Sequence, residues 1–213
     1  MAKFPNSPGA SALAGLEPAR VTLPAGSTLA RIYYTASAHP MGWNEFRPYG
    51  PLNVRWEPHL PTAEGEPHSQ ARGVYYAALD ACTCLAEVFQ ATRRIDRVYQ
   101  APWLVVFKTA TALELLDLSG EMATRMGASL AIHSGSRARA RGWARDLYET
   151  FPTGQGIVYA SSLHAGRPAL ALNERALDGR FFPAHPELHR ALADDVLLDP
   201  LKHAAQALGY ALR

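Results

Sequence analysis

The sequence predicts an α+β fold. Runs of β-branched and aromatic residues are mixed with segments of helical spacing, without the regular strand–helix–strand order of a doubly wound sheet. The chain has 213 residues, 48% hydrophobic and 19% charged, which is enough for one sizeable core. We therefore expect one domain at residues 29–213, ending in a C-terminal helical segment. It follows a partly loose N-terminal arm, residues 1–28, rich in Pro, Gly, Ala and Ser.

Strands are expected where apolar and β-branched residues cluster between turn residues. These segments are residues 29–36, 73–79, 102–110, 112–120, 154–163 and 167–174. Helical spacing appears at 81–94, 121–133, 136–150 and within 184–213. Asp80 is a suitable N-cap for the helix that contains Glu87. The long loop at 37–72 carries tryptophans and arginines, which argues for a functional loop rather than a disordered one.

Several protein classes are excluded or disfavoured by composition. No apolar run reaches the ~20 residues of a membrane span, and the N-terminus lacks the apolar stretch of a signal peptide. The two cysteines, Cys82 and Cys84, are too close together to form a disulfide framework, which fits a reducing compartment. We therefore expect a cytoplasmic protein. The formal net charge of +2 favours no class of partner.

The common catalytic motifs are missing. The chain has no P-loop, no dinucleotide-binding GxGxxG after a strand, no HExxH, no zinc-ligand spacing and no GxSxG elbow. No metal is therefore expected. The arginines at 137–145 could contact nucleic acid, but a solvated helix face explains them better, since the whole chain has little excess charge.

A dispersed pattern remains after these exclusions. Arg31 opens the first strand, and Trp43-Asn44-Glu45-Phe46 follows in the long loop. The other pieces are Arg55-Trp56, Tyr76-Ala77, Ala86-Glu87 and Gly156-Ile157-Val158-Tyr159-Ala160-Ser161. The order and spacing of these pieces resemble the RES domain family, which is named for its Arg, Glu and Ser positions. The resemblance covers roughly residues 29–175.

The resemblance implies a fold like that of the ADP-ribosyltransferases, a split mixed or antiparallel sheet with flanking helices around an NAD cleft. It implies a toxin of a toxin–antitoxin pair that degrades NAD+ by hydrolysis or phosphorolysis, or ADP-ribosylates a protein. The implied partner is an Xre-type helix-turn-helix antitoxin, through which any contact with nucleic acid would be indirect. No cofactor beyond NAD+ as substrate is implied. Oligomeric state stays open, with a homodimer among the options.

The resemblance also implies residue roles, and side-chain chemistry agrees with them. Glu87 could stabilise the oxocarbenium-like state formed when the nicotinamide–ribose bond breaks. Arg31 and Arg55 could bind the diphosphate of NAD+, because a guanidinium offers a planar fork of donors. Tyr76 could stack on nicotinamide or bind a phosphate. Catalysis is thus assigned to Glu87, Arg55 and Tyr76.

Ser161 completes the expected NAD-binding set with Arg31, Arg55 and Tyr76. Its hydroxyl is suited to bind a carboxamide, ribose or phosphate oxygen rather than to act as a nucleophile. Ser162 is the rival, because a slip of one residue reverses the face of a strand. Tyr159, two residues before Ser161, would share its face. The acceptor (water, phosphate or protein) stays open, and an inert binding domain is the non-enzymatic alternative.

Overall fold

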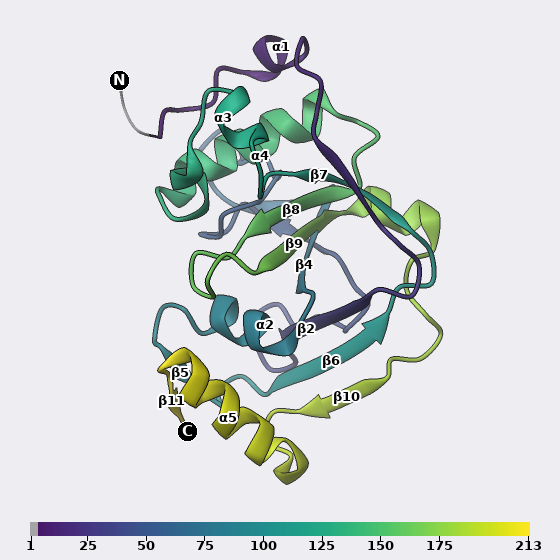
Figure 1. Ribbon diagram of the computed structural model, residues 1–213, viewed down its shortest axis with the longest axis vertical. Coiled ribbons are helices and arrows are strands. Elements are labelled where there is room, and N and C mark those ends of the chain that lie inside the picture. Colours follow the sequence, from purple (N-terminus) through teal and green to yellow (C-terminus); the bar gives the residue numbers. More distant parts are fainter. Residues whose placement is uncertain (1–3) are drawn as a thin grey trace.

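The computed structural model describes residues 4–213 and has a large mixed sheet flanked by helices (Figure 1). The strands are β1 (Arg20–Leu23), β2 (Thr28–Tyr34), β3 (Arg47–Gly50), β4 (His68–Ala78), β5 (Arg94–Ile95), β6 (Pro102–Lys108), β7 (Leu113–Asp117), β8 (Gly156–Ala160), β9 (Pro168–Asn173), β10 (Leu188–Ala191) and β11 (Ala211–Leu212). The α-helices are α1 (Ala10–Leu13), α2 (Ala81–Val88), α3 (Met122–Arg125), α4 (Arg137–Thr150) and α5 (Leu198–Leu208). Short 3-10 helices are η1 (Leu130–His133), η2 (Glu174–Gly179) and η3 (Asp195–Leu197).

Within residues 4–213, nine strands form one sheet in the order β1-β7-β8-β9-β4-β2-β6-β10, with β3 paired to β4 beside this path. The β7–β8 pair is parallel. The other pairs in this sheet are antiparallel. A separate ribbon joins β5 and β11 in parallel. The predicted α+β class with a mixed, mostly antiparallel sheet is confirmed.

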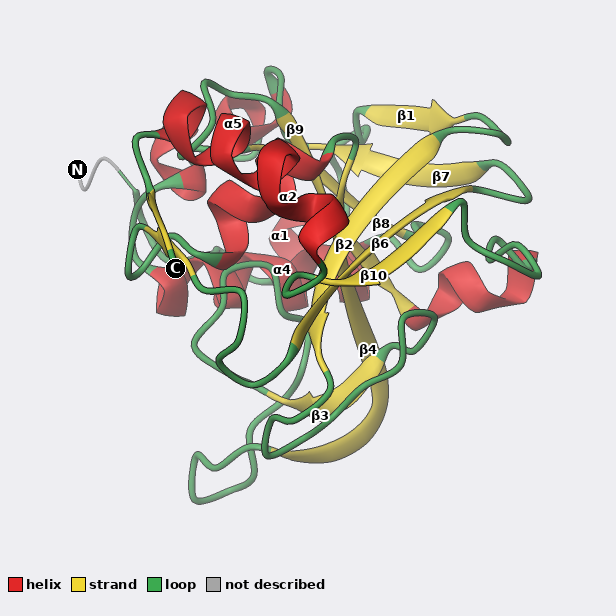
Figure 2. Ribbon diagram, turned by 90° about the horizontal axis from the view of Figure 1, so that it is seen from below, coloured by secondary structure: helices red, strands yellow, loops and turns green. Residues whose placement is uncertain are grey.

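The sheet is split between β2 and β4. In the described chain these strands are paired only at Ala30 and Ala78, whereas β2 pairs with β6 along its whole length. Beyond the junction β4 bends away towards β3 (Figure 2). Strands that separate in this way leave room for side chains from both of them, and Arg31 and Tyr76 lie next to the junction.

The helices cover different parts of the sheet. Helices α1 and α4 share a core with the N-terminal arm, in which Phe4, Leu13 and Trp143 are buried. Helices α2 and α5 share a second core, and the Tyr210 hydroxyl donates to the carbonyl of Ala86 in α2 at 3.3 Å. A third core combines aliphatic residues with an aromatic group that includes Tyr75, Phe107 and Phe181. No helix among residues 4–213 has the length and hydropathy needed to cross a membrane.

Several elements differ from the sequence-based expectations. Residues 1–3 of the expected arm lie outside the described residues, and the rest of the arm supplies α1 and β1. The helix expected at 121–133 is interrupted after α3, where Gly127 has a φ of 86°. The C-terminal segment contains α5 as expected, but the helical interpretation is wrong for Leu188–Ala191. That stretch is β10, the strand at the edge of the sheet, because pairing with β6 outweighs its weak local preference.

Candidate active site

A cavity of about 600 Å³ lies at the split in the sheet. Its lining includes Arg31, Arg55, Tyr76 and Glu87, which come from β2, the 51–60 loop, β4 and α2. Four segments that are distant in sequence therefore meet at one site. The volume is within the range of roughly 300–1,000 Å³ that is typical of small-molecule sites.

Glu87 is held at this cavity by the start of α2 and by β8. Asp80 ends the strand-to-helix turn as the N-cap, and its side chain accepts a hydrogen bond from the Thr83 backbone amide at 2.8 Å. The Ser161 hydroxyl donates to Oε1 of Glu87 at 2.6 Å, and the Tyr159 hydroxyl lies 3.4 Å from Oε2. Ser161 and Tyr159 thus approach one carboxylate from the same side of the chain, as their spacing predicts.

The two candidate serines have different surroundings. Ser161 is fully buried, and its oxygen also accepts hydrogen bonds from the amides of Leu163 at 3.3 Å and His164 at 3.2 Å. A hydroxyl has one proton to donate and two lone pairs, so all the capacity of Ser161 is used inside the protein. Ser162 is exposed and lines the cavity.

Arginines dominate the charge of the cavity wall. Its arginines are Arg31, Arg47, Arg55 and Arg137. Among residues 4–213, only Arg47 of this set forms an ion pair with a carboxylate, that of Glu57. The guanidinium groups of Arg31, Arg55 and Arg137 therefore have no ion-paired carboxylate in the described chain, although the charge of Glu87 acts on Arg55. Such a wall favours an anionic ligand.

Arg31 and Arg55 are held by groups that leave donors free. Arg31 is 7% exposed, donates to the carbonyl of Glu45 at 3.1 Å, and stacks over Tyr75 with its guanidinium carbon 3.9 Å from the ring centroid. One Nη of Arg55 donates to the carbonyls of Ile132 at 3.1 Å and Gly135 at 2.8 Å. Burial lowers the pKa of both guanidinium groups, but arginine remains charged in proteins.

Two buried polar groups beside the cavity lack a partner in the described chain. The Tyr76 hydroxyl has none, and burial, reinforced by Glu57, raises its pKa, so it stays a neutral phenol. His133 uses Nε2 in a 3.0 Å contact with the Leu118 carbonyl, and its Nδ1 is unpaired. Burial lowers the pKa of His133, and Arg55 lowers it further. His133 is therefore neutral, with Nε2 as its donor.

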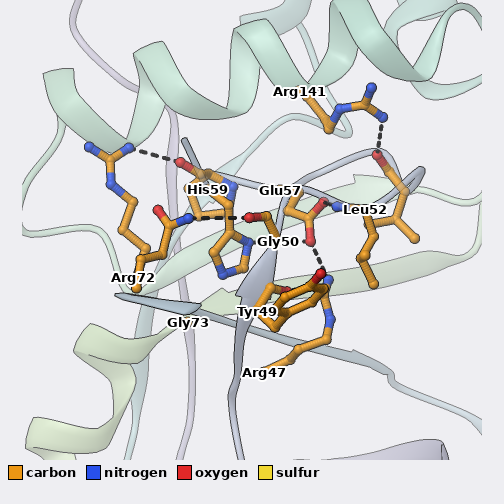
Figure 3. A network of polar contacts seen from close by, with 12 residues as sticks. Arg47, Tyr49, Gly50, Leu52, Glu57, His59, Arg72, Gly73 and Arg141 are labelled. Carbon is orange, nitrogen blue, oxygen red and sulfur yellow. Dashed lines mark hydrogen bonds and ion pairs between the residues drawn. The ribbon is translucent and has the colours of Figure 1, made fainter. Parts of the chain in front are cut away.

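A buried carboxylate, Glu57, anchors the loop that carries Arg55 (Figure 3). Its oxygens accept hydrogen bonds from Arg47 and from the backbone amide of Leu52, and Nδ1 of His59 lies 3.2 Å from Oε1. The Glu57 and His59 side chains are fully buried, so the ion pair with Arg47 compensates a charge that would otherwise be costly. The network fixes residues 52–54 in the cavity wall.

The far end of the cavity has a different character. The exposed imidazole of His39 lines it and stacks on Tyr49, with ring centroids 4.3 Å apart and an interplanar angle of 27°. Strand register separates this pair from Tyr76. Tyr49 pairs with Ser69, which lies seven residues before Tyr76 on β4.

Sequence reasoning missed His39, Arg47, Glu57, His133 and Arg137. None of them stands in a catalytic motif. The fold brings His39, Arg47, His133 and Arg137 to the cavity wall, and Glu57 pairs with Arg47. Arg137 belongs to the basic stretch that was expected to be a solvated helix face. In the structure Arg137 donates to Gln90 Oε1 at 2.8 Å, Arg139 to the Phe4 carbonyl at 2.7 Å, and Arg141 to the Val54 carbonyl at 3.3 Å. The side chains of this stretch therefore form hydrogen bonds that attach α4 to segments distant in the sequence.

The resemblance-based segment at residues 43–46 also has a structural role. Trp43 and Phe46 pack against the aromatic core, around Phe107 and Phe182, rather than against the cavity. Cys84 lines the cavity, and burial raises the pKa of its thiol to about 12. A thiol with that pKa is not a ready nucleophile.

Comparison with known proteins agrees with this architecture. The chain superposes on a chain from the crystal structure of the M. tuberculosis MbcT–MbcA toxin–antitoxin complex with a TM-score of 0.53. The two share 17% sequence identity, over 85% of this chain and 92% of that one. At this identity the likeness concerns the fold. No curated protein is significantly similar in sequence. Residues 28–200 match the RES domain family, and the chain therefore belongs to that family.

Proposed function

We propose that this protein consumes NAD+ by cleaving the bond between nicotinamide and ribose. One observation carries the proposal: the wall of a cavity of about 600 Å³ holds Arg31, Arg55 and Arg137, which have no ion-paired carboxylate among residues 4–213, together with the carboxylate of Glu87. The arginines suit the diphosphate, and the carboxylate suits a developing positive charge. Membership of the RES family supports the same assignment.

In the proposed pose the ligand lies along the sheet. The nicotinamide ribose would be next to Glu87 and Tyr76, and the diphosphate next to Arg31 and Arg55. The adenine would stack on His39, whose other face is on Tyr49.

The reaction needs little from the protein beyond positioning and charge. As the bond breaks, the ribose becomes oxocarbenium-like, and the negative charge of Glu87 would stabilise it. Nicotinamide leaves as a neutral molecule, so no general acid is needed at its nitrogen. Ser161 would hold the Glu87 carboxylate in place rather than bind the substrate. Its hydroxyl donates to Glu87, and no donor or lone pair is left for a ligand.

We also propose the biological setting. The protein would be a cytoplasmic toxin, held inactive by an Xre-type helix-turn-helix antitoxin that would mediate any contact with nucleic acid. Family membership and the fold shared with a chain from a toxin–antitoxin complex support this setting. Co-expression with a small helix-turn-helix protein encoded beside it should relieve growth arrest and yield a co-purifying complex.

The test is release of nicotinamide from NAD+ labelled in the nicotinamide ring, with and without inorganic phosphate. Glu87→Gln should lower release about 100-fold or more, because it removes the charge while keeping the shape. Glu114→Gln, an exposed carboxylate on β7, is the matched control and should behave as wild type. Unimpaired turnover in Glu87→Gln contradicts the role of Glu87.

The products decide the acceptor. ADP-ribose indicates water, and ADP-ribose 1″-phosphate indicates phosphate. Intact-mass spectra of extract proteins with added ADP-ribose would instead favour the transferase alternative. Absence of both nicotinamide release and NAD+ binding at millimolar concentration would contradict the proposal and favour an inert binding domain.

A further inference from the structure

The turn between β8 and β9 is attached to α2 at two points. Ser161 binds Glu87 at 2.6 Å, and His164 Nδ1 lies 2.8 Å from Oγ1 of Thr83. Thr83 and Glu87 are four residues apart in α2, so they lie on the same face of the helix. The second attachment lies outside the cavity, since neither Thr83 nor His164 is among its lining residues.

The protons in the second attachment have a fixed direction. The Thr83 hydroxyl lies 2.7 Å from Oδ2 of Asp80 as well as 2.8 Å from His164 Nδ1. A carboxylate can only accept, so the one hydroxyl proton of Thr83 is donated to Asp80. Nδ1 of His164 must then carry a proton and donate to Thr83. The chain of bonds runs from His164 through Thr83 to the N-cap of α2.

The turn transmits the position of His164 to Ser161. The His164 amide donates to the Ser161 hydroxyl oxygen at 3.2 Å. The turn is closed by hydrogen bonds from Ser161 N to the Arg167 carbonyl at 2.8 Å and from Gly166 N to the Ser161 carbonyl at 2.9 Å. Thr83 is fully buried, so water cannot replace its partners easily. A shift of His164 would therefore displace the hydroxyl that holds Glu87.

We propose that Thr83 and His164 are positioning residues that hold the Ser161 turn on α2 and so fix the carboxylate of Glu87. The proposal rests on the NAD+-cleaving function proposed above. Neither side chain touches the substrate in this arrangement. Their loss should lower kcat and leave KM nearly unchanged, because a misplaced catalytic group costs rate even when the ligand still binds.

The experiment compares Thr83→Val with Thr83→Ser. Valine keeps the shape and the backbone amide but removes the hydroxyl, and serine restores it. Thr83→Val should lower kcat by between about tenfold and 100-fold with KM within about twofold, and Thr83→Ser should recover most of the loss. The matched control is Thr92→Val, which removes an exposed hydroxyl just beyond the same helix.

A double mutant tests whether Thr83 acts through Ser161. If it does, Thr83→Val combined with Ser161→Ala should be no slower than Ser161→Ala alone. Multiplicative losses would overturn the proposal, as would failure of Thr83→Ser to recover activity. Should Thr83→Val not fold, His164→Leu against His164→Asn gives the same comparison, because asparagine keeps a donor.

A measurement that does not depend on NAD+ turnover distinguishes failure of this proposal from failure of the proposed function. Amide hydrogen exchange of His164 should be faster in Thr83→Val than in wild type or Thr92→Val. If the wild-type protein does not consume NAD+, the proposed function fails, and the exchange rates still decide whether Thr83 holds the turn. Unchanged exchange, or faster exchange with unchanged kcat, overturns the positioning role.

Discussion

The Ser161 hydroxyl and the Glu87 carboxylate, 74 positions apart, share a 2.6 Å hydrogen bond in which serine is the donor. The bond links the turn after β8 to α2. It assigns the two serines different tasks, since Ser162 faces the cavity and Ser161 does not.

This difference gives a paired prediction for the serines. Ser161→Ala should lower kcat about tenfold or more with little change in KM, because Glu87 loses a charge-assisted hydrogen bond. Ser162→Ala should instead leave kcat nearly unchanged, and any effect should be on KM. Steady-state kinetics of nicotinamide release measure both. The reverse pattern would show that Ser161 contacts the substrate directly.

The stacked His39 predicts a binding effect at the opposite end of the cavity. His39→Ala should raise KM for NAD+ about tenfold with kcat unchanged, because base stacking contributes ~1–3 kcal/mol. His185→Ala, another exposed histidine that does not line the cavity, serves as control. Equal KM values for the two variants would place the adenine elsewhere.

The buried Glu57 network predicts that Gly50 cannot be replaced. A Cβ on Gly50 would lie 2.6 Å from Nδ1 of His59 and 2.9 Å from Oε1 of Glu57, and neither side chain can swing into solvent. Gly50→Ala should lower the free energy of unfolding by about 1–3 kcal/mol in urea denaturation.

Gly142→Ala is the matched control for Gly50. It adds a methyl group inside α4, where the nearest atom is an Arg145 Nη at 3.9 Å. It should raise the free energy of unfolding by about 0.5–1 kcal/mol, because alanine favours the helix. Destabilisation of similar size in both variants would refute the specific clash.

His133 predicts a pH dependence of stability. Burial holds its pKa below the ordinary value, so the unfolded chain binds more protons than the folded one as pH falls. The stabilisation is fully present above the unfolded pKa of about 6.5 and is lost as pH falls towards the lower folded pKa. Urea denaturation between about pH 5 and 7.5 should therefore show a smaller loss of stability on acidification in His133→Gln than in wild type. A parallel pH dependence in the two proteins would mean that His133 has the same pKa in the folded and the unfolded chain.

The sequence predicts the elements near Glu87 well because their signals are local. Asp80 before an apolar helical stretch indicates an N-cap, and the structure confirms α2 directly after β4. The alternation of Tyr159 and Ser161 places both on one side of β8, and both hydroxyls lie near Glu87. Such features depend on neighbours within a few residues.

The remaining parts of the site depend on contacts distant in sequence. Arg47 in β3 and Glu57 in the following loop form their buried ion pair within a segment that has no periodicity, so nothing in the sequence indicates that the charges meet. Strand β10 shows the same limit, since it becomes a strand by pairing with β6. Which serine faces the cavity depends on the tight turn after β8 rather than on strand alternation.

Among residues 4–213, one residue pair joins β2 to β4, so this junction is the least extensively paired in the sheet. A ligand held by Arg31 on β2 and by Tyr76 on β4 would link the two strands across this junction. Ligand binding would then hold the two halves of the sheet together. Strands β2 and β4 would separate more easily in the ligand-free protein than in the complex.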